Sequence, residues 1–355
     1  MKIVVATGGS GGHIFPALQT ARVLKERGHE VIFVGSLGFA EERIKSLGFE
    51  AVNIKAQGLI RSLGGLVKFC FVMIQAVSQT KKILKNYHPD KVIGFGGYGS
   101  FAAVMSAKQL GILTMIHEQN VVPGKANRFL ARFVKKIAIS FPQAQRYFGT
   151  EKTVWTGCPC QQNSLLEPRE RIFQKFSLDP NKKTILVLGG SQGSQKLNDI
   201  FFETISSLGQ KSNMQAIHMT GEKDFALYLS QYKDKNLPVK VFEFISPIEE
   251  AYAIADMVIA RSGAATVSEL GFFVIPSILI PYPLADGHQR FNAEVLSELG
   301  LAKIIEQKNL TSELLKREIQ SILAVSSNKD DFRGKIKNIF KQNPANELAL
   351  AVEDL

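Results

Sequence analysis

Two glycine-rich runs in the first half of the chain have the composition of anion-binding loops. Thr7–His13 (TGGSGGH) follows the apolar stretch Lys2–Ala6, and Gly96–Ser100 (GGYGS) follows the apolar stretch Lys91–Gly94. Glycines let the backbone approach a ligand closely, and a helix that begins there presents N–H groups to negative charge. Two such runs in one domain suit a pyrophosphate better than a single phosphate.

His13 ends the first run, and an imidazole is suited to act as a general base near neutral pH. Glu118, in the polar run His117–Asn120, is the second candidate for this base. A capping or turn role is the alternative for both residues. A dinucleotide site is a weaker interpretation of the first run, because the second expected strand ends at Gly35 without the acidic residue that binds ribose.

The second half of the chain carries a further set of polar groups. Gly189–Ser194 is a third candidate anion loop. Glu269 lies one helical turn beyond Ala265, so its carboxylate could accept both hydroxyls of a ribose; an exposed helix glutamate is the alternative. Asp286–Asn292 brings amide and imidazole groups that suit sugar hydroxyls. The spacing of His, Cys, Asp and Glu indicates no metal site, and we expect no cofactor.

The elements that must position these residues alternate between strand and helix. The strand Lys2–Ala6 precedes a helix expected from about Phe15 to Arg27, and the same order restarts at Thr184–Leu188 after a polar stretch. This alternation predicts an α/β protein with two doubly wound parallel sheets. Ligands bind such sheets beyond the carboxyl ends of the strands, so two facing domains would place their loops around one cleft.

Charge and composition limit the partners. The 355 residues carry a formal net charge of +11, and residues 1–157 hold 21 Lys and Arg against 8 Asp and Glu. This one-sided charge favours an anionic partner. A nucleic acid is disfavoured, because no expected strand face interleaves aromatic and basic side chains. Three cysteines exclude a disulfide framework and indicate a reducing compartment.

A membrane surface is the other anionic candidate. No stretch offers the ~20 apolar residues of a spanning helix, and the start of the chain reads as a strand with no signal peptide. The helix expected over Leu63–Lys85 carries an apolar stripe followed by Lys81 and Lys82. The stripe consists of Val67, Phe71, Ile74 and Val77. It is either a core face with a solvated basic end or a patch that binds anionic lipid.

Together these motifs resemble glycosyltransferase family 28, and within it the N-acetylglucosaminyltransferases that act on lipid I in peptidoglycan synthesis. The resemblance runs nearly end to end and rests on Gly8–His13, Gly96–Tyr98, His117–Asn120, Gly189–Gly193, Arg261–Glu269 and Asp286–Ala293. It implies a GT-B fold with an acceptor and membrane-associating domain, 1–157, rejoined by a last helix at about 341–355. Residues 158–340 would form the donor-binding domain.

The resemblance also implies the reaction. GlcNAc would pass from UDP-GlcNAc to the C4 hydroxyl of MurNAc in lipid I with inversion, forming lipid II. A related lipid glycosyltransferase with a diacylglycerol acceptor is the alternative. The implied location is peripheral, at the cytoplasmic face of the bacterial inner membrane. The implied partners are UDP-GlcNAc, lipid I, anionic lipid and other cell-wall synthesis proteins.

The resemblance assigns the contacts residue by residue. Donor contacts fall on Ser10, Gly11, Gly12, Asn120, Gln161, Ser191, Ile245, Arg261, Ala264, Ala265, Thr266, Val267, Ser268, Glu269, His288 and Gln289. Acceptor contacts fall on Gly96, Gly97, Tyr98 and Asn127, with Ser10–Gly12 also on the acceptor side. The membrane patch is Val67, Phe71, Ile74 and Val77, flanked by Lys81 and Lys82. Gln161 stands where the family has an arginine that reaches the donor pyrophosphate.

Overall fold

The computed structural model of the protein describes residues 1–38, 40–56, 63–160, 167–190, 193–209, 213–283, 287–324 and 330–355. The chain forms two compact units. Unit 1 comprises Met1–Cys160 and Ile339–Leu355, and unit 2 comprises Gln161–Asn338. The sequence-based boundaries, after residues 157 and 340, differ from these by two or three residues.

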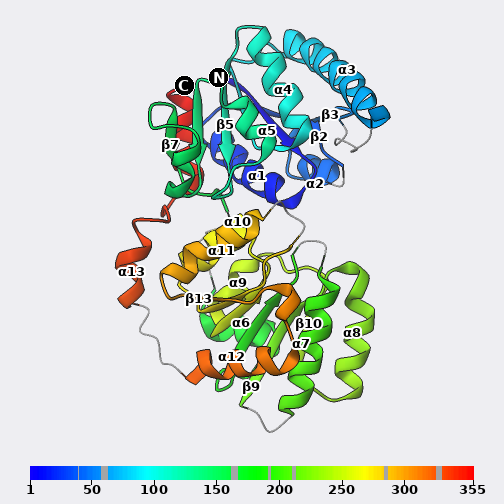
Figure 1. The fold of residues 1–355 in the computed structure, drawn as a ribbon, viewed down its shortest axis with the longest axis vertical. Coiled ribbons are helices and arrows are strands. Elements are labelled where there is room, and N and C mark those ends of the chain that lie inside the picture. The colour runs from blue at the N-terminus through cyan, green and yellow to red at the C-terminus, as the bar shows by residue number, and fades with distance from the viewer. Residues whose placement is uncertain are drawn as a thin grey trace. The chain divides into compact units, whose positions relative to one another are not determined.

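Unit 1 is built on a seven-stranded sheet with all its strands parallel, in the order β3-β2-β1-β4-β5-β6-β7 (Figure 1). The strands are β1 (Lys2–Gly8), β2 (Glu30–Ser36), β3 (Glu50–Asn53), β4 (Lys91–Gly94), β5 (Leu113–Glu118), β6 (Lys136–Ile139) and β7 (Thr153–Trp155). The helices are α1 (Gly11–Glu26), α2 (Ala40–Ser46), α3 (Leu63–Tyr87), α4 (Gly97–Gln109), α5 (Lys125–Leu130), the 3-10 helix η1 (Pro142–Tyr147) and α14 (Pro344–Glu353).

The two faces of this sheet are covered by different helices, as the side-chain alternation of β1 requires. Ile3 and Val5 point into a core formed with α1, α2 and α14. Val4 and Ala6 point into a second core formed with α3, α4 and α5. Both faces of the strand are therefore apolar, which explains why β1 reads as a continuous hydrophobic run in the sequence.

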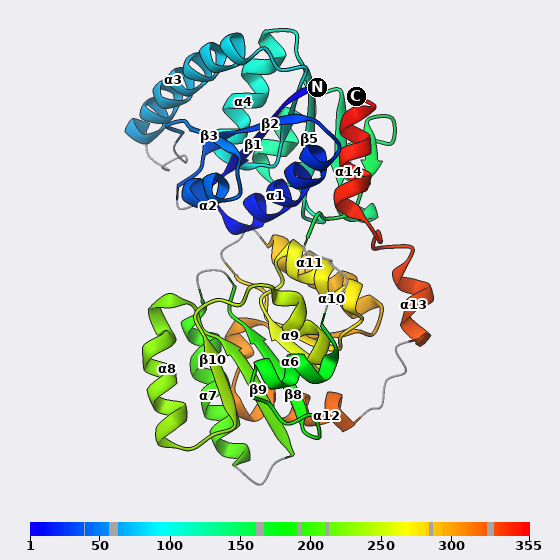
Figure 2. The same ribbon diagram turned by 180° about the vertical axis from the view of Figure 1, so that it is seen from behind.

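The helix α14 returns to unit 1 after the whole of unit 2 and packs along α1 (Figure 2). The Arg27 guanidinium binds both carboxylate oxygens of Glu353, at 2.8 and 2.6 Å, and His29 Nε2 lies 2.6 Å from Glu353 Oε1. Lys91 Nζ donates to the backbone carbonyls of Val352 and Glu353. The hydrogen bonds from Arg27 and His29 lower the pKa of Glu353 to about 2.

We expect Glu353→Gln to lower the thermal midpoint of unfolding by a few degrees at pH 7, because it removes a bidentate ion pair. A carboxyl whose pKa is lowered on folding stabilises the fold above its ordinary pKa of 4.5 and loses that effect as the pH falls toward 2. The difference between parent and variant should therefore vanish in acid, measured by circular dichroism. Glu347→Gln on the same helix, where the carboxylate lies 3.6 Å from Lys341 Nζ, is the control. Equal midpoints for the two variants would contradict this role.

Unit 2 is a second parallel sheet, of six strands in the order β10-β9-β8-β11-β12-β13. Its strands are β8 (Lys183–Leu188), β9 (Met214–Met219), β10 (Val239–Phe242), β11 (Met257–Ala260), β12 (Ser277–Leu279) and β13 (Ala302–Ile304). Its helices are α6 (Arg169–Lys175), α7 (Gln195–Leu208), α8 (Glu222–Asp234), α9 (Ile248–Ile254), α10 (Ala264–Phe273), α11 (His288–Glu298), the 3-10 helix η2 (Gln307–Asn309), α12 (Ser312–Ala324) and α13 (Asp330–Ile336).

The strand order reverses once in each unit. In unit 1 the reversal lies between β1 and β4, and in unit 2 it lies between β8 and β11. Loops that leave such neighbouring strands run to opposite faces of the sheet and open a crevice at the carboxyl ends. The glycine-rich runs singled out in the sequence follow β1, β4 and β8, so the topology brings them to these two points.

Candidate active site

The two glycine-rich runs of unit 1 are in direct contact at the reversal between β1 and β4. A Cβ atom added to Gly97 would lie 2.9 Å from Gly8 Cα, and Gly97 has a φ of +82°. Only glycine fits there, because a side chain would collide with backbone and be strained as well. α1 begins at Gly11 and α4 at Gly97, so two helix N-termini converge on one place. Their free N–H groups suit an anionic ligand.

His13 lies in the first turn of α1, because the helix begins at Gly11 and not at the predicted Phe15. Ser10 precedes the helix, and its Oγ is hydrogen-bonded to His13 Nδ1 at 2.8 Å. The ring lies against Gly96, where an added Cβ would be 2.9 Å from Nε2. Burial lowers the pKa of His13 to about 4. The imidazole is therefore neutral near pH 7, as a proton acceptor must be.

Glu118 holds the loop that follows β5. It is buried, and one carboxylate oxygen accepts from the backbone N–H and side-chain amide of Asn120, at 2.9 and 3.1 Å. The other oxygen accepts from the Gly124 N–H and the Asn127 amide, at 3.1 and 2.9 Å. Burial raises the pKa of this carboxyl, and these four hydrogen bonds oppose the rise. Such a fully engaged carboxylate is a poor second candidate for the base.

The residues expected at the acceptor divide into two groups. Gly96 and Gly97 lie at the start of α4 with Tyr98, whose exposed ring makes an edge contact with Phe69 at 5.7 Å. Asn127 is buried, and its amide nitrogen donates to the His117 carbonyl as well as to Glu118. Asn127 thus holds the end of β5, and its contact with the acceptor stays a prediction.

In unit 2 the loops after β8 and β11 are joined by Arg261. Its guanidinium donates to Ser194 Oγ at 2.6 Å, to the Ile280 carbonyl at 3.1 Å and to the side chain of Gln307. Ser194 immediately precedes α7. The described bonds of Arg261 are to protein groups and fix the end of the glycine-rich run, and its donor contact stays a prediction. The sequence could not reveal this role, since the partners are distant along the chain.

The predicted donor contacts along α10 alternate between the interior and the surface. Ala264, Val267 and Ser268 are buried, whereas Ala265, Thr266 and Glu269 are partly exposed. The side chain of Val267 is fully buried, so a donor contact at this residue would have to come from its backbone. Because the helical period is 3.6 residues, the side chains of this run point in different directions, and the donor contacts of the run stay predictions. Ile245, expected beside the uracil, is also largely buried, beyond the end of β10.

Glu269 is bound by a residue that the sequence analysis did not identify. The Tyr252 hydroxyl, from α9, donates to Glu269 Oε2 at 2.8 Å. Burial raises the pKa of Glu269 to about 8, the Tyr252 hydrogen bond opposes the rise, and the charge of Glu249 adds to it. No motif contains Tyr252, so its role could be found only once α9 and α10 were placed.

The start of α11 carries the two remaining described donor residues. Gln289 Oε1 accepts from the backbone N–H of Tyr282 at 2.9 Å, and the Gln289 carbonyl accepts from Ser262 Oγ at 2.8 Å. His288 is the first residue of the helix. The loops after β11 and before α11 are therefore tied together. Gln161, Ser191 and Asp286 lie outside the described residues, as does the side chain of Val67.

The stripe predicted on α3 is not a single face. Phe71 is 60% exposed and Ile74 69% exposed, whereas Val77 packs against the core beside Met73 and Ala76. Lys82 is exposed and Lys81 partly buried. The core interpretation therefore holds for Val77 and fails for Phe71 and Ile74, which form an apolar surface on a basic helix. In the described part of the chain, no helix combines the length and apolar character needed to cross a bilayer.

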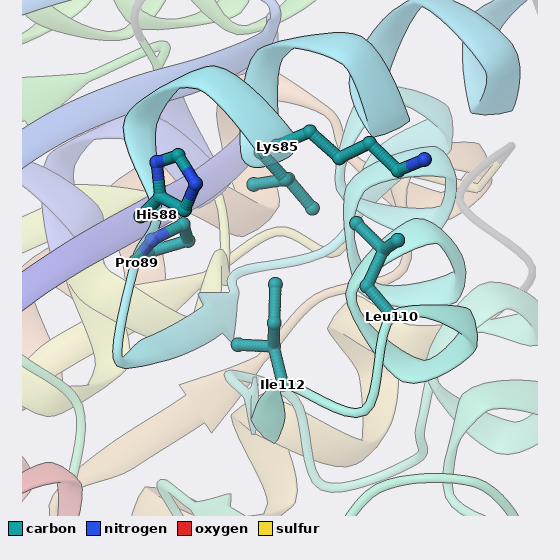
Figure 3. A pocket seen from close by; sticks show the side chains of 6 residues that line it. Lys85, His88, Pro89, Leu110 and Ile112 are labelled. Atoms are coloured by element: carbon teal, nitrogen blue, oxygen red, sulfur yellow. The ribbon is translucent and has the colours of Figure 1, made fainter.

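A pocket of about 460 Å³ lies at the other end of α3 (Figure 3). Leu84, Leu110 and Ile112 line it with Pro89, and Lys85 and His88 add two basic side chains. Pro89 and Ile112 stand just before β4 and β5, at the amino ends of the strands. The predicted site residues follow the carboxyl ends, so this pocket belongs to a different part of unit 1. Over the described ranges, no group of three His, Cys, Asp or Glu side chains could hold a metal ion.

Comparison with known proteins agrees with these two units. Residues 3–139 match the glycosyltransferase family 28 N-terminal domain, and residues 184–348 match the glycosyltransferase family 28 C-terminal domain. The chain belongs to glycosyltransferase family 28. The predicted family and the enzyme class, a glycosyltransferase, are therefore confirmed.

The relatives of this family 28 chain match it over nearly its full length. The UDP-N-acetylglucosamine--N-acetylmuramyl-(pentapeptide) pyrophosphoryl-undecaprenol N-acetylglucosamine transferase of Thermodesulfovibrio yellowstonii is 38% identical, covering 91% of this chain and 90% of the relative. The transferase of the same name from Desulforamulus reducens is 36% identical, and the match covers 97% of this chain and 94% of the relative. The crystal structure of Acinetobacter baumannii MurG aligns with a TM-score of 0.77 and 25% sequence identity. The alignment covers 100% of this chain and 99% of the MurG chain. The predicted GT-B class, with two parallel-sheet domains, is confirmed.

Proposed function

We propose that this family 28 glycosyltransferase transfers GlcNAc from UDP-GlcNAc to the C4 hydroxyl of MurNAc in lipid I, forming lipid II and UDP. The observation that carries the proposal is the 38% identity, over nine-tenths of both chains, to a transferase named for this reaction. The geometry agrees with it. In unit 1 two helix N-termini converge, as a pyrophosphate-bearing acceptor requires, and a diacylglycerol acceptor would have no such group.

In the proposed mechanism His13 is the general base. Its neutral imidazole takes the proton of the C4 hydroxyl as the oxygen attacks the anomeric carbon of GlcNAc, and the bond from that carbon to UDP breaks. Negative charge then develops on the departing pyrophosphate. The N-terminus of α7 and the loop that Arg261 fixes can stabilise that charge through backbone N–H groups. Glu269 and Gln289 would hold the ribose and the sugar of the donor.

The test is product formation by the purified protein with labelled UDP-GlcNAc and a lipid I analogue. We expect a β-1,4-linked disaccharide on the pyrophosphoryl lipid and none on diacylglycerol. Transfer to diacylglycerol alone would establish the alternative acceptor. Absence of transfer to either lipid would exclude the proposed function.

We also propose that unit 1 binds the membrane through a surface formed by Phe71, Ile74 and the lysines of α3. A polyprenyl acceptor cannot leave the bilayer, so its enzyme must approach the surface. The two exposed apolar side chains can enter the acyl boundary, and each nearby lysine contributes about 1 kcal/mol on anionic lipid. The location would be the cytoplasmic face, where UDP-GlcNAc is made, and other cell-wall synthesis proteins would be neighbours there.

We expect Phe71→Asp with Ile74→Asp to reduce binding to anionic vesicles and activity on a long-chain acceptor, while activity on a short, water-soluble acceptor survives. Binding should weaken with salt without vanishing, because the apolar contribution is insensitive to salt. Vesicle sedimentation and the two acceptor assays measure this. Leu227→Asp with Leu229→Asp, a matched exposed pair on α8, is the control. If both activities fell and the amount of folded protein fell with them, Phe71 and Ile74 would be shown to have a structural role.

A further inference from the structure

Glu269 is one of two glutamates that lie close together on neighbouring helices. Glu249 on α9 is only 2% exposed, and its charge acts on Glu269 on α10. Tyr252, one turn after Glu249 on the same helix, donates its hydroxyl to Glu269 Oε2 at 2.8 Å. The tyrosine thus occupies one oxygen of the carboxyl group that the proposed function assigns to the ribose.

We propose that binding of UDP-GlcNAc expels a proton from the Glu249–Glu269 pair, and that Tyr252 is a positioning residue that holds Glu269 for the ribose. The inference rests on the proposed function, since it takes Glu269 as the acceptor of the ribose hydroxyls.

The free protein and the donor-bound protein favour different protonation forms of the Glu269 carboxyl group. Glu249 is buried and Glu269 is partly buried beside it, and two neighbouring carboxylates repel, so the free protein keeps a proton on the pair. Burial and the charge of Glu249 raise the pKa of Glu269 to about 8. Ribose hydroxyls are donors, and an ionised carboxylate offers only acceptors. The donor therefore binds the ionised form, and the proton passes to solvent.

The other charged groups on α9 and α11, the helices that pack against α10, form ion pairs or lie in solvent, as Glu298 at the end of α11 does. On α9, Glu250 forms an ion pair with Lys175. On α11, Arg290 binds Glu294 and Glu306. His288 begins α11, and His288→Gln is the control for this helix.

The test is titration calorimetry of the whole protein with UDP-GlcNAc in buffers of different ionisation enthalpy. This ligand has a pyrophosphate diester with no proton to lose near neutral pH, so any proton released comes from the protein. For a pKa near 8 that falls well below 7 on binding, so that the bound carboxyl is ionised, we expect about 0.9 proton released per donor at pH 7. The dissociation constant should tighten about tenfold or more between pH 6 and pH 8.

Three variants separate this from a structural role. Glu249→Gln removes the repelling charge, so the donor should bind a few-fold more tightly at pH 7 with fewer protons released. Tyr252→Phe removes a hydrogen bond to the ionised form, so binding should weaken a few-fold and its pH dependence move to higher pH. Glu250→Gln, on the same helix and paired with Lys175, should leave both quantities unchanged.

The outcomes are distinct. UDP-GlcNAc binding with no proton released at pH 7 would overturn this inference and leave the proposed function intact. Proton release that disappears in His288→Gln and persists in Glu249→Gln would assign it to the histidine and also overturn the inference. Absence of any UDP-GlcNAc binding would overturn the inference together with the proposed function.

Discussion

We expect His13→Ala to lower turnover by about 10²–10⁴-fold, the usual effect of losing a general base, with donor binding nearly unchanged. The weak nucleophile of the proposed reaction is an alcohol, which needs a proton acceptor in place. His13 is held for that role by Ser10 on one side and the bare backbone of Gly96 on the other. Steady-state turnover with a lipid I analogue and calorimetry with UDP-GlcNAc measure the two quantities.

The pH dependence of kcat/KM provides a second test of His13. Because burial lowers the pKa of His13 to about 4, protonation of this imidazole should not reduce kcat/KM between neutral pH and about pH 6. The decrease in kcat/KM that protonation of His13 causes should lie at a pH well below about 6. His88→Asn is the control, because asparagine tolerates the left-handed backbone of that exposed histidine, φ +52°. Turnover of His13→Ala within a few-fold of the parent would exclude it as the base.

The second large effect should come from Glu269→Ala. A hydrogen bond to a charged group contributes roughly 1.5–3 kcal/mol, so losing the ribose contact should raise the donor dissociation constant tenfold or more. The loss should be larger above pH 8 than at pH 7, since the pKa of about 8 leaves the parent carboxyl mostly protonated at neutral pH. Calorimetry with UDP-GlcNAc at both pH values measures it.

The matched control for this variant is Glu250→Ala. Its carboxylate pairs with Lys175 on the neighbouring helix α6, so the donor should bind it as it binds the parent. An unchanged donor affinity in Glu269→Ala would remove this residue from the site.

The alternation of strands and helices was predictable, because central strands such as β1 and β8 are apolar on both faces and stand out in the sequence. The start of α1 was not. Gly11 and Gly12 are poor helix formers, so the pattern placed the start at Phe15. The helix begins earlier because the first run is anchored by its contact with Gly97, which is distant in sequence.

The roles of individual polar residues were the least predictable. Arg261 and Asn127 have side chains that suit a ligand, yet Arg261 bonds to Ser194 in a distant segment and Asn127 bonds to the end of β5. For the stripe on α3 the residue types alone could not decide between a core face and a surface patch. Phe71 and Ile74 are exposed, whereas Met73, Ala76 and Val77 pack in the core. Residue type indicates which chemistry is possible, and only the packing decides which partner uses it.

The return of α14 to unit 1 sets an order for folding during synthesis. Domains generally fold as units while the ribosome elongates the chain. Unit 2 is continuous in sequence and can fold as soon as it emerges. Unit 1 is made first, yet the core face that includes Ile3 and Val5 also needs Leu348 and Val352. Unit 1, although translated earlier, is thus the unit that is completed later.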